Sequence, residues 1–341
     1  MKILITGSAG FIGGYLVSEF LEAGYDVVGV DNFSKYGPVE KSFGKNSRYQ
    51  LVDGDAKDST LLKSLLKDCD HFIAAAAMIG GISYFHAFAY DLIAENERIT
   101  AAAFDAAIHA VKNDKLKKIT LLSSSMVFEC TEEYPTPEGA EHRCPPPRST
   151  YGFQKLAAEY FALGAHEQYA LPYTICRPFN CVGIGERRAL RDADVMSGNV
   201  KLAMSHVVPD LVQKILAGQD PVHLLGSGSQ VRHYTYGGDL ARGIRHCVEH
   251  PAALNQDFNL STAKATSVIE LAEVIWKKIH REDGKPFRYV SDQPYKYDVQ
   301  VRSPSVVKAE QLLGFRAETS LDQILDEVIP WVAEQRRHGQ I

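Results

Sequence analysis

A run of closely spaced glycines near the start of the chain most constrains its fold. Gly7 and Gly10 lie between the apolar segment Lys2–Thr6 and a helical pattern over Phe11–Ala23, and Gly13 lies in the first turn of that pattern. There the first glycine permits a tight turn, the second lets the backbone approach a pyrophosphate, and the third allows close helix packing. The N-terminus of the helix offers N–H groups to the phosphates. A glycine triplet alone also serves plain turns, but between a first strand and a first helix it predicts a dinucleotide-binding βαβ unit.

Strand and helix patterns alternate through the first half of the chain. Short apolar runs predict further strands over Asp26–Val30, Arg48–Val52, Asp70–Ala77 and Lys118–Ser123. Helical patterns lie among them over Ser59–Leu66, Ala89–Val111 and Ser149–Gln168. This alternation indicates right-handed βαβ units. The fold class that we predict is α/β, a Rossmann doubly wound parallel sheet.

The second half is less regular and predicts a smaller α+β substrate-binding lobe at the C-terminal side. Helical patterns return over Val207–Ala217, Ser267–Ile279 and Leu321–Glu334, and a Gly-Ser-Gly-Ser turn follows Leu225. We expect residues 1–180, with 234–260 returning to them, to form the dinucleotide-binding domain. Residues 181–233 and 261–341 are then expected to form the substrate lobe.

Composition excludes several classes of function. The chain has 341 residues, with 37 Lys and Arg against 42 Asp and Glu, so it lacks the dense positive charge of a nucleic-acid binder. Its 6 cysteines form no CxxC pair, which argues against a zinc site or a disulfide framework, and we expect no metal. No apolar stretch is long enough to span a bilayer. We therefore predict a soluble cytoplasmic protein with no membrane partner.

Two aspartates lie at the ends of predicted strands, where they would contact a bound dinucleotide. Asp31 ends the second strand, and a carboxylate there accepts hydrogen bonds from ribose hydroxyls and repels a 2′-phosphate, which selects NAD over NADP. Asp55 and Ala56 follow the third strand, where an adenine edge would lie. An ordinary turn aspartate remains an alternative for Asp55.

Tyr151 and Lys155 point most directly to chemistry. Their four-residue spacing places both on one face of a helix, one turn apart. A phenol with a pKa of ~10 is a poor base at neutral pH, and lowering that pKa by ~3 units needs ~4 kcal/mol. A neighbouring ammonium and a positively charged nicotinamide ring supply this in a partly dry cleft. The Ser123–Ser125 run, at the end of the preceding strand, adds the hydroxyl that completes a proton-handling trio.

Over essentially its whole length, the chain resembles the extended short-chain dehydrogenase/reductase superfamily, and within it the nucleotide-sugar epimerases and dehydratases. The motifs that carry the resemblance are the glycine run, Asp31-Asn32, Asn96, Ser123–Ser125, Tyr151 with Lys155, Arg177–Asn180, Gly226–Arg232, Arg302–Pro304, Lys308-Ala309 and Leu313-Gly314.

The resemblance implies tightly bound, recycled NAD and assigns roles to particular residues. The expected catalytic residues are Ser124, Tyr151 and Lys155, and the choice between Ser124 and Ser125 stays open. The expected cofactor contacts are Gly7, Gly10, Phe11, Ile12, Gly13, Asp31, Asn32, Asp55, Ala56, Ala75, Ala76, Ala77, Asn96, Ser123, Tyr151, Lys155 and Pro178. The expected substrate contacts are Ser125, Asn180, Arg187, Arg232 and Arg302. Two anionic phosphates favour charge-assisted donors such as Arg232 and Arg302.

Met126 bears on the type of reaction. The opening step shared by these relatives removes the sugar hydroxyl proton to tyrosinate and the C4 hydride to NAD, which gives a 4-keto sugar. Dehydratases and decarboxylases place a Glu around position 126, and 3,5-epimerases place a Cys. A methionine thioether transfers no proton. The ketone is therefore expected to be reduced again on its other face, which is 4-epimerisation.

The substrate that we expect is a UDP-hexose. UDP-glucuronate with UDP-galacturonate is favoured over UDP-glucose with UDP-galactose, because the segment around Arg302–Pro304 resembles that of glucuronate-processing relatives. A GDP-hexose epimerase or reductase stays open, because Met78–Ile82 resembles the Gly-Gly loop of GDP-sugar enzymes. A catalytically silent NAD-binding regulatory protein is a further alternative. Relatives pair two helices per subunit, so we expect a homodimer through helices near 89–111 and 151–168.

Overall fold

The computed structural model describes residues 1–79, 88–187, 189, 195–202, 206–294 and 298–340. Its main element is a seven-stranded sheet in the order β13-β6-β5-β4-β1-β2-β3, and every neighbouring pair is parallel. Its strands are β1 Lys2–Thr6, β2 Asp26–Asp31, β3 Tyr49–Asp53, β4 His71–Ala74, β5 Lys118–Leu122, β6 Tyr173–Pro178 and β13 Gln256–Leu260. The predicted α/β fold with a doubly wound parallel sheet is confirmed.

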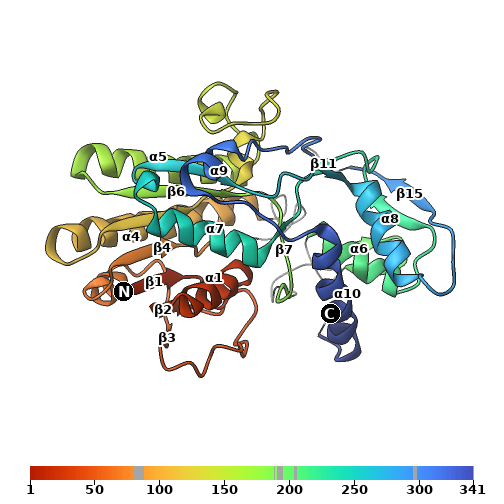
Figure 1. Cartoon of the computed structure of the whole chain (residues 1–341), viewed down its shortest axis with the longest axis horizontal. Coiled ribbons are helices and arrows are strands. Elements are labelled where there is room, and N and C mark those ends of the chain that lie inside the picture. Colours follow the sequence, from red (N-terminus) through yellow and green to blue (C-terminus); the bar gives the residue numbers. More distant parts are fainter. Residues whose placement is uncertain (80–87, 188, 190–194, 203–205, 295–297, 341) are drawn as a thin grey trace.

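Helices cover both faces of the sheet, as Figure 1 shows. One face carries α1 (Phe11–Glu22), α7 (Gly237–Glu249) and α9 (Val307–Leu313), and the other carries α2 (Ser59–Leu66), α4 (Ala89–Asn113) and α5 (Thr150–Tyr169). Each layer closes over its own apolar core, with Phe20 and Phe258 on the first face and Phe72 and Leu62 on the second. Burial on both faces accounts for the continuous apolar runs of the strands.

The strand order reverses at β1, and this reversal positions the ligand site. β1 pairs with β2 on one side and with β4 on the other, so the loops after these strands diverge to opposite faces. A crevice forms at the carboxyl ends of such strands, and doubly wound folds bind ligands there. The glycine run, Asp31 and the segment after β4 all meet at this edge.

The C-terminal lobe lies at the other end of the molecule, on the right in Figure 1. Its helices are α6 (Val207–Leu216), α8 (Val268–Ile279) and α10 (Leu321–Arg337), close to the ranges that the sequence predicts. They share an apolar core that includes Leu211, Trp276 and Val328.

Short strand pairs complete the lobe and connect it to the sheet. They are β8 Val195–Ser197 with β9 Val200–Leu202, β10 Val222–Leu225 with β15 Tyr289–Asp292, β11 Val231–Arg232 with β14 Thr266–Ser267, and β7 Cys181–Val182 with β12 Thr235–Tyr236. β13 and α7 lie with the main sheet, although the exact division into two domains stays a prediction. Among the described residues, no helix has the length and apolar character needed to cross a membrane.

Candidate active site

The glycine loop between β1 and α1 forms a cradle that no larger residue would fit. Gly7 has a φ of +73°, and a Cβ there would lie 2.9 Å from the Cα of Ala76. A Cβ on Gly13 would lie 1.9 Å from the carbonyl oxygen of Gly7. The backbone therefore stays open at the N-terminus of α1, where N–H groups and the helix dipole favour a phosphate. This geometry fits a dinucleotide.

Asp31 is held at the mouth of this loop by two backbone amides. Its Oδ2 accepts from the N–H of Ala9 at 3.0 Å, and its Oδ1 accepts from the N–H of Phe33 at 2.8 Å. A carboxylate oxygen accepts more than one hydrogen bond, so both retain capacity for ribose hydroxyls. Thr6 fixes the neighbouring segment, because its Oγ1 accepts from the N–H groups of Ala75 and Ala76, each at 3.2 Å.

Ser124, Tyr151 and Lys155 line the same cavity as the glycine loop. Ser124 hydrogen-bonds with Tyr151, whereas Ser123 Oγ donates to Glu159 at 2.5 Å. Burial raises the pKa of Tyr151, and the Ser124 hydrogen bond and the charge of Arg302 lower it. The geometry therefore places Ser124 as the hydroxyl partner of Tyr151.

Lys155 lies one helical turn after Tyr151. Its Nζ donates to the carbonyl oxygen of Leu122 at 3.0 Å, which fixes the ammonium at the end of β5. Burial lowers the pKa of Lys155 to about 8, and the negative charge of Glu159 opposes this effect. Lys155 is therefore mainly charged at neutral pH, as its expected role requires.

A buried ion network stands behind these residues, and the sequence reading missed it. The Nε and Nη2 of Arg177 donate to the two carboxylate oxygens of Glu159 at 2.8 and 2.7 Å. The remaining donors reach Asp257 at 2.6 Å and Glu141 at 2.9 Å. Because Ser123 and Arg177 share the Glu159 carboxylate, the network fixes the end of β5 against α5. In the sequence, the four-residue spacing of Lys155 and Glu159 places both on one face of the helix, and this spacing was a signal that could have pointed to the network.

Met126 lies in the wall of the same cavity. It packs with Leu92 and Tyr151 in one apolar cluster, and its backbone N–H donates to Ser124 Oγ at 3.2 Å. The position therefore places a thioether, which transfers no proton, against Tyr151.

Two arginines of the C-terminal lobe meet near Tyr151. Arg232 donates to the backbone carbonyls of Val231 at 2.8 Å and Val299 at 2.6 Å, so its guanidinium also fixes the segment that leads to Arg302. Burial and the charge of Arg232 lower the pKa of Arg302 to about 9, and it stays charged at neutral pH. Its Nε is buried without a hydrogen-bond partner. Two adjacent cations attract an anion, although the carboxylate of Asp298 already lies 3.6 Å from the guanidinium of Arg232.

One cavity of about 1410 Å³ joins these groups. This exceeds the 300–1,000 Å³ typical of a single small-ligand pocket, so it has room for two ligands end to end. Among the described residues, several polar atoms of side chains that line this cavity are buried and have no hydrogen-bond partner. They are Asn180 Nδ2, Asp210 Oδ1, Gln230 Oε1, Tyr234 Oη and Arg302 Nε.

The cavity brings most of the predicted site residues together. Those that line it are Gly7, Gly10, Phe11, Ile12, Gly13, Asp31, Asn32, Asp55, Ala56, Ala75, Ala76, Ala77, Ser123, Ser124, Ser125, Tyr151, Lys155, Pro178, Asn180, Arg232 and Arg302. Asn180 has a φ of +40°, a conformation that asparagine tolerates better than most residues. Their individual contacts with ligands stay predictions.

Two predicted site residues lie outside the lining. The amide of Asn96 is engaged with the backbone of Met78, accepting from its N–H at 2.7 Å and donating to its carbonyl at 2.9 Å. Asn96 therefore fixes the segment after β4 rather than facing the cavity. Arg187 donates to Gln340 at 3.1 Å near the C-terminus. The Gly-Gly pair of Met78–Ile82 lies outside the described residues.

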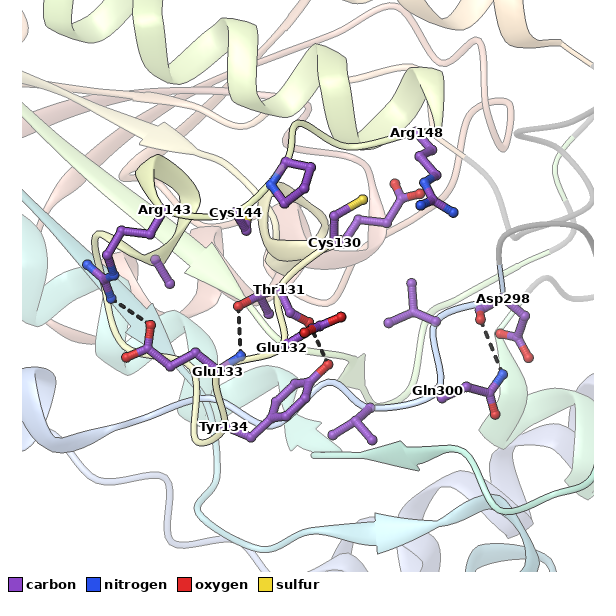
Figure 2. Close-up of a pocket in the computed structure, with 15 residues that line it drawn as sticks. Cys130, Thr131, Glu132, Glu133, Tyr134, Arg143, Cys144, Arg148, Asp298 and Gln300 are labelled. Carbon is purple, nitrogen blue, oxygen red and sulfur yellow. Dashed lines mark hydrogen bonds and ion pairs between the residues drawn. The ribbon is translucent and has the colours of Figure 1, made fainter.

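Arg148 is a further cavity residue that the sequence reading missed. It also lines a second pocket of about 760 Å³, drawn in Figure 2, and the two pockets share Arg148 and Asp298. Figure 2 shows Arg143 paired with Glu133 at one end of that pocket and Arg148 at the other. Among the described residues Arg148 has no ion pair, and it lies three positions before Tyr151.

Solved structures share this architecture over nearly the whole chain. The UDP-glucose 4-epimerase of Thermotoga maritima, solved with UDP-glucose, matches with a TM-score of 0.80 and 26% identity, covering 98% of this chain and 100% of that one. The UDP-glucuronic acid 4-epimerase of Bacillus cereus, solved with UDP-glucuronic acid and NAD, matches with a TM-score of 0.80 and 25% identity, covering 98% and 99%.

Sequence comparison points the same way. A putative UDP-glucose 4-epimerase of Methanocaldococcus jannaschii is 27% identical over 336 residues, which cover 98% of this chain and 99% of the relative. Residues 3–261 match the model of the NAD dependent epimerase/dehydratase family. This span contains the glycine cradle and the Ser124, Tyr151 and Lys155 group. The chain therefore belongs to the NAD-dependent epimerase/dehydratase family, which confirms the resemblance seen in its sequence and its predicted dependence on NAD.

Proposed function

We propose that this protein is a UDP-hexose 4-epimerase, with UDP-glucuronate and UDP-galacturonate as its substrate pair. The observation that carries the reaction type is the arrangement around Tyr151. Ser124 hydrogen-bonds with the phenol, Lys155 lies one helical turn further along α5 with its ammonium at the end of β5, and Met126 packs against Tyr151. The site thus has one proton-transferring tyrosine and a thioether where a second acid or base would otherwise stand.

The chain's own residues hold the reactants and move one proton. The glycine loop and Asp31 hold NAD, which when bound takes up and returns the C4 hydride of the sugar. The phenolate oxygen of Tyr151 accepts the proton of the C4 hydroxyl as the ketone forms, and Ser124 hydrogen-bonds with the same phenol. The ammonium of Lys155 stabilises the phenolate, since a nearby positive charge favours the ionised form. Reduction of the opposite face, with the proton returned from Tyr151, gives the C4 epimer.

Two features support a carboxylated sugar. Arg148 lines the cavity beside Tyr151 without an ion pair among the described residues, and an unpaired guanidinium suits a carboxylate. The Ser124-Ser125 hydroxyls lie in the same wall. The Bacillus cereus relative with UDP-glucuronic acid is as similar as the UDP-glucose relative, so similarity alone does not favour either sugar.

The proposed reaction is tested by NMR in D₂O. Purified protein is incubated without added cofactor in separate tubes with UDP-glucuronate, UDP-glucose and GDP-mannose. We expect UDP-glucuronate to convert to its C4 epimer with no deuterium at carbon, because the hydride is retained in the site. Deuterium at C3 or C5 would indicate enolisation and would refute simple 4-epimerisation. If no tube changes, the incubation is repeated with added NAD.

We further propose a homodimer through α4 and α5, which pack side by side on one face of the sheet. These helices carry exposed aromatic residues, with Tyr90 at 77%, Tyr160 at 57% and Phe153 at 48% exposure. Large aromatic side chains are enriched at protein interfaces. Light scattering after size-exclusion chromatography gives the mass, and Tyr160→Glu is expected to shift it to the monomer. The cytoplasmic location predicted from the sequence stays a prediction.

A further inference from the structure

Glu129 connects the loop that carries Ser124 to the start of the helix that carries Tyr151. It follows η1 (Ser125–Phe128), the 3₁₀ turn after β5. Its carboxylate accepts the backbone N–H of Ser149 at 3.1 Å on each oxygen, and Oε2 also accepts the Ser149 hydroxyl at 2.5 Å. Among the described residues this carboxylate forms no ion pair, so the start of α5 is what holds it.

Ser149 passes this contact on to the first turn of α5. It is the N-cap of the helix, and its Oγ accepts from the backbone N–H of Gly152 at 3.0 Å. The hydroxyl therefore uses its proton for Glu129 and a lone pair for Gly152. Tyr151 lies between the capping residue and Gly152, so the cap fixes the turn from which the phenol projects. A helix N-terminus leaves backbone N–H groups unsatisfied and favours a nearby negative charge, which suits a carboxylate.

The first turn of α5 packs directly against the loop that ends at Glu129. A Cβ on Gly152 would lie 2.8 Å from the carbonyl oxygen of Met126 and 2.9 Å from Oε2 of Glu129, so the close approach requires a glycine. The backbone N–H of Met126 in turn donates to Ser124 Oγ, and Ser124 hydrogen-bonds with Tyr151. The contact between Ser124 and the phenol therefore depends on how closely η1 meets α5.

The charge of Glu129 also reaches the phenol by way of Arg302. Burial and the charge of Arg232 lower the pKa of Arg302 to about 9, and the negative charge of Glu129 is one of the influences that oppose this. Burial raises the pKa of Tyr151, whereas the Ser124 hydrogen bond and the charge of Arg302 lower it. Both the contacts and the charge of Glu129 therefore favour an ionised phenol.

We propose that Glu129 is a positioning residue, which fixes the N-cap of α5 and so holds the Tyr151 phenol against Ser124. Glu129 lines the second pocket rather than the cavity of the predicted ligands, so it acts through Ser149 and not on the reacting atoms. This inference rests on the proposed function, because it takes Tyr151 to be the proton acceptor of 4-epimerisation.

The test compares Glu129→Gln with the wild type in the epimerisation of UDP-glucuronate by the NAD-loaded protein. A glutamine presents an NH₂ group where the N–H and hydroxyl of Ser149 need acceptors, so the contact loosens. Because a displacement of about 1 Å can cost about 100-fold in rate, we expect kcat per NAD-binding site to fall about 10- to 100-fold. KM and the Kd for NAD should stay unchanged. Glu133→Gln is the matched control and should keep the wild-type kcat, because Glu133 lies in the same loop but pairs with the exposed Arg143.

Variants of Ser149 show whether Glu129 acts through the cap. Ser149→Ala should lower kcat in the same way, whereas Ser149→Thr keeps a capping hydroxyl and should retain the wild-type kcat. The double variant E129Q/S149A should be no slower than the slower single variant, because the two residues act as one unit. Losses that multiply in the double variant would overturn the inference. If Glu129→Gln does not fold, Glu129→Asp, which keeps the charge but shortens the side chain, should lower kcat with KM unchanged.

A measurement without substrate separates this inference from the proposed function. The ultraviolet absorbance of the Tyr151 phenolate is followed against pH, as the difference between each NAD-loaded protein and its Tyr151→Phe counterpart. Lys155 and Arg302 are present in every protein. We expect ionisation in Glu129→Gln to need a pH about one unit higher than in the wild type, a tenfold change in the ionisation constant, and Glu133→Gln to match the wild type.

An unchanged phenolate titration in Glu129→Gln would overturn the inference, as would a raised KM with an unchanged kcat. A shifted titration in a protein that epimerises no nucleotide sugar would support the positioning role of Glu129 while refuting the proposed function.

Discussion

Glu159→Gln tests the role of the buried ion network around Arg177, which lies behind α5. The side chain of Arg177 is 1% exposed and that of Glu159 is 4% exposed, and they form two parallel charge-assisted hydrogen bonds. The substitution leaves a buried guanidinium with one of its three carboxylate partners neutralised. Breaking a buried pair in this way costs about 3–5 kcal/mol. We expect the lower part of this range, about 3 kcal/mol, because Asp257 and Glu141 still face Arg177.

The assay is thermal unfolding of the NAD-loaded protein followed by circular dichroism. For a chain of this size, about 3 kcal/mol corresponds to a fall of about 6 °C in Tm, at about 2 °C per kcal/mol. Glu273→Gln is the control, because the Glu273–Lys277 pair is exposed and exposed pairs contribute at most about 1 kcal/mol. A Tm for Glu159→Gln within 1 °C of the control variant, with intact structure, would refute the argument from burial.

Four further outcomes follow from the site and its surroundings. Tyr151→Phe removes the proton acceptor, so kcat for 4-epimerisation should fall by about 10²–10⁴ while the Kd for NAD in a fluorescence titration stays unchanged. Gly13→Ala should abolish NAD binding in that titration, because there is no room for the added Cβ. Gly164→Ala is the control: a Cβ there would have no atom within 4 Å, so this variant should bind NAD normally and have a slightly higher Tm. Arg148→Ala should raise KM for UDP-glucuronate about tenfold, the loss of one charge-assisted hydrogen bond, and leave KM for UDP-glucose unchanged; equal effects on both sugars would contradict a carboxylate contact. Burial and nearby lysines lower the pKa of His71 from 6.5 to about 4. As the pH falls, His71 of the unfolded chain therefore binds a proton before His71 of the folded chain does, and the free energy of unfolding should fall by about 3 kcal/mol between pH 6.5 and 4. Urea titrations of His71→Leu over the same pH range should show a correspondingly smaller fall in the free energy of unfolding.

The sequence alone determined the features that depend on local spacing. The alternation of apolar runs and helical patterns predicted the parallel sheet, since the spacing of apolar residues within each segment distinguishes a strand from a helix. The glycine run predicted the cradle at the N-terminus of α1, because a steric requirement for glycine acts within a few residues. The i, i+4 spacing of Tyr151 and Lys155 likewise placed both on one helix face.

Only the tertiary structure decided the features that join distant segments. It paired Ser124 with Tyr151 and Ser123 with Glu159, because these contacts depend on how the end of β5 meets α5. The choice between Ser124 and Ser125 as the catalytic hydroxyl stays a prediction. It engaged Asn96 with the Met78 backbone and Arg187 with the C-terminal region, although both looked suitable as ligand contacts. The chain cannot signal such pairings locally, since they bring together residues far apart in sequence whose contacts depend on the packing of whole elements.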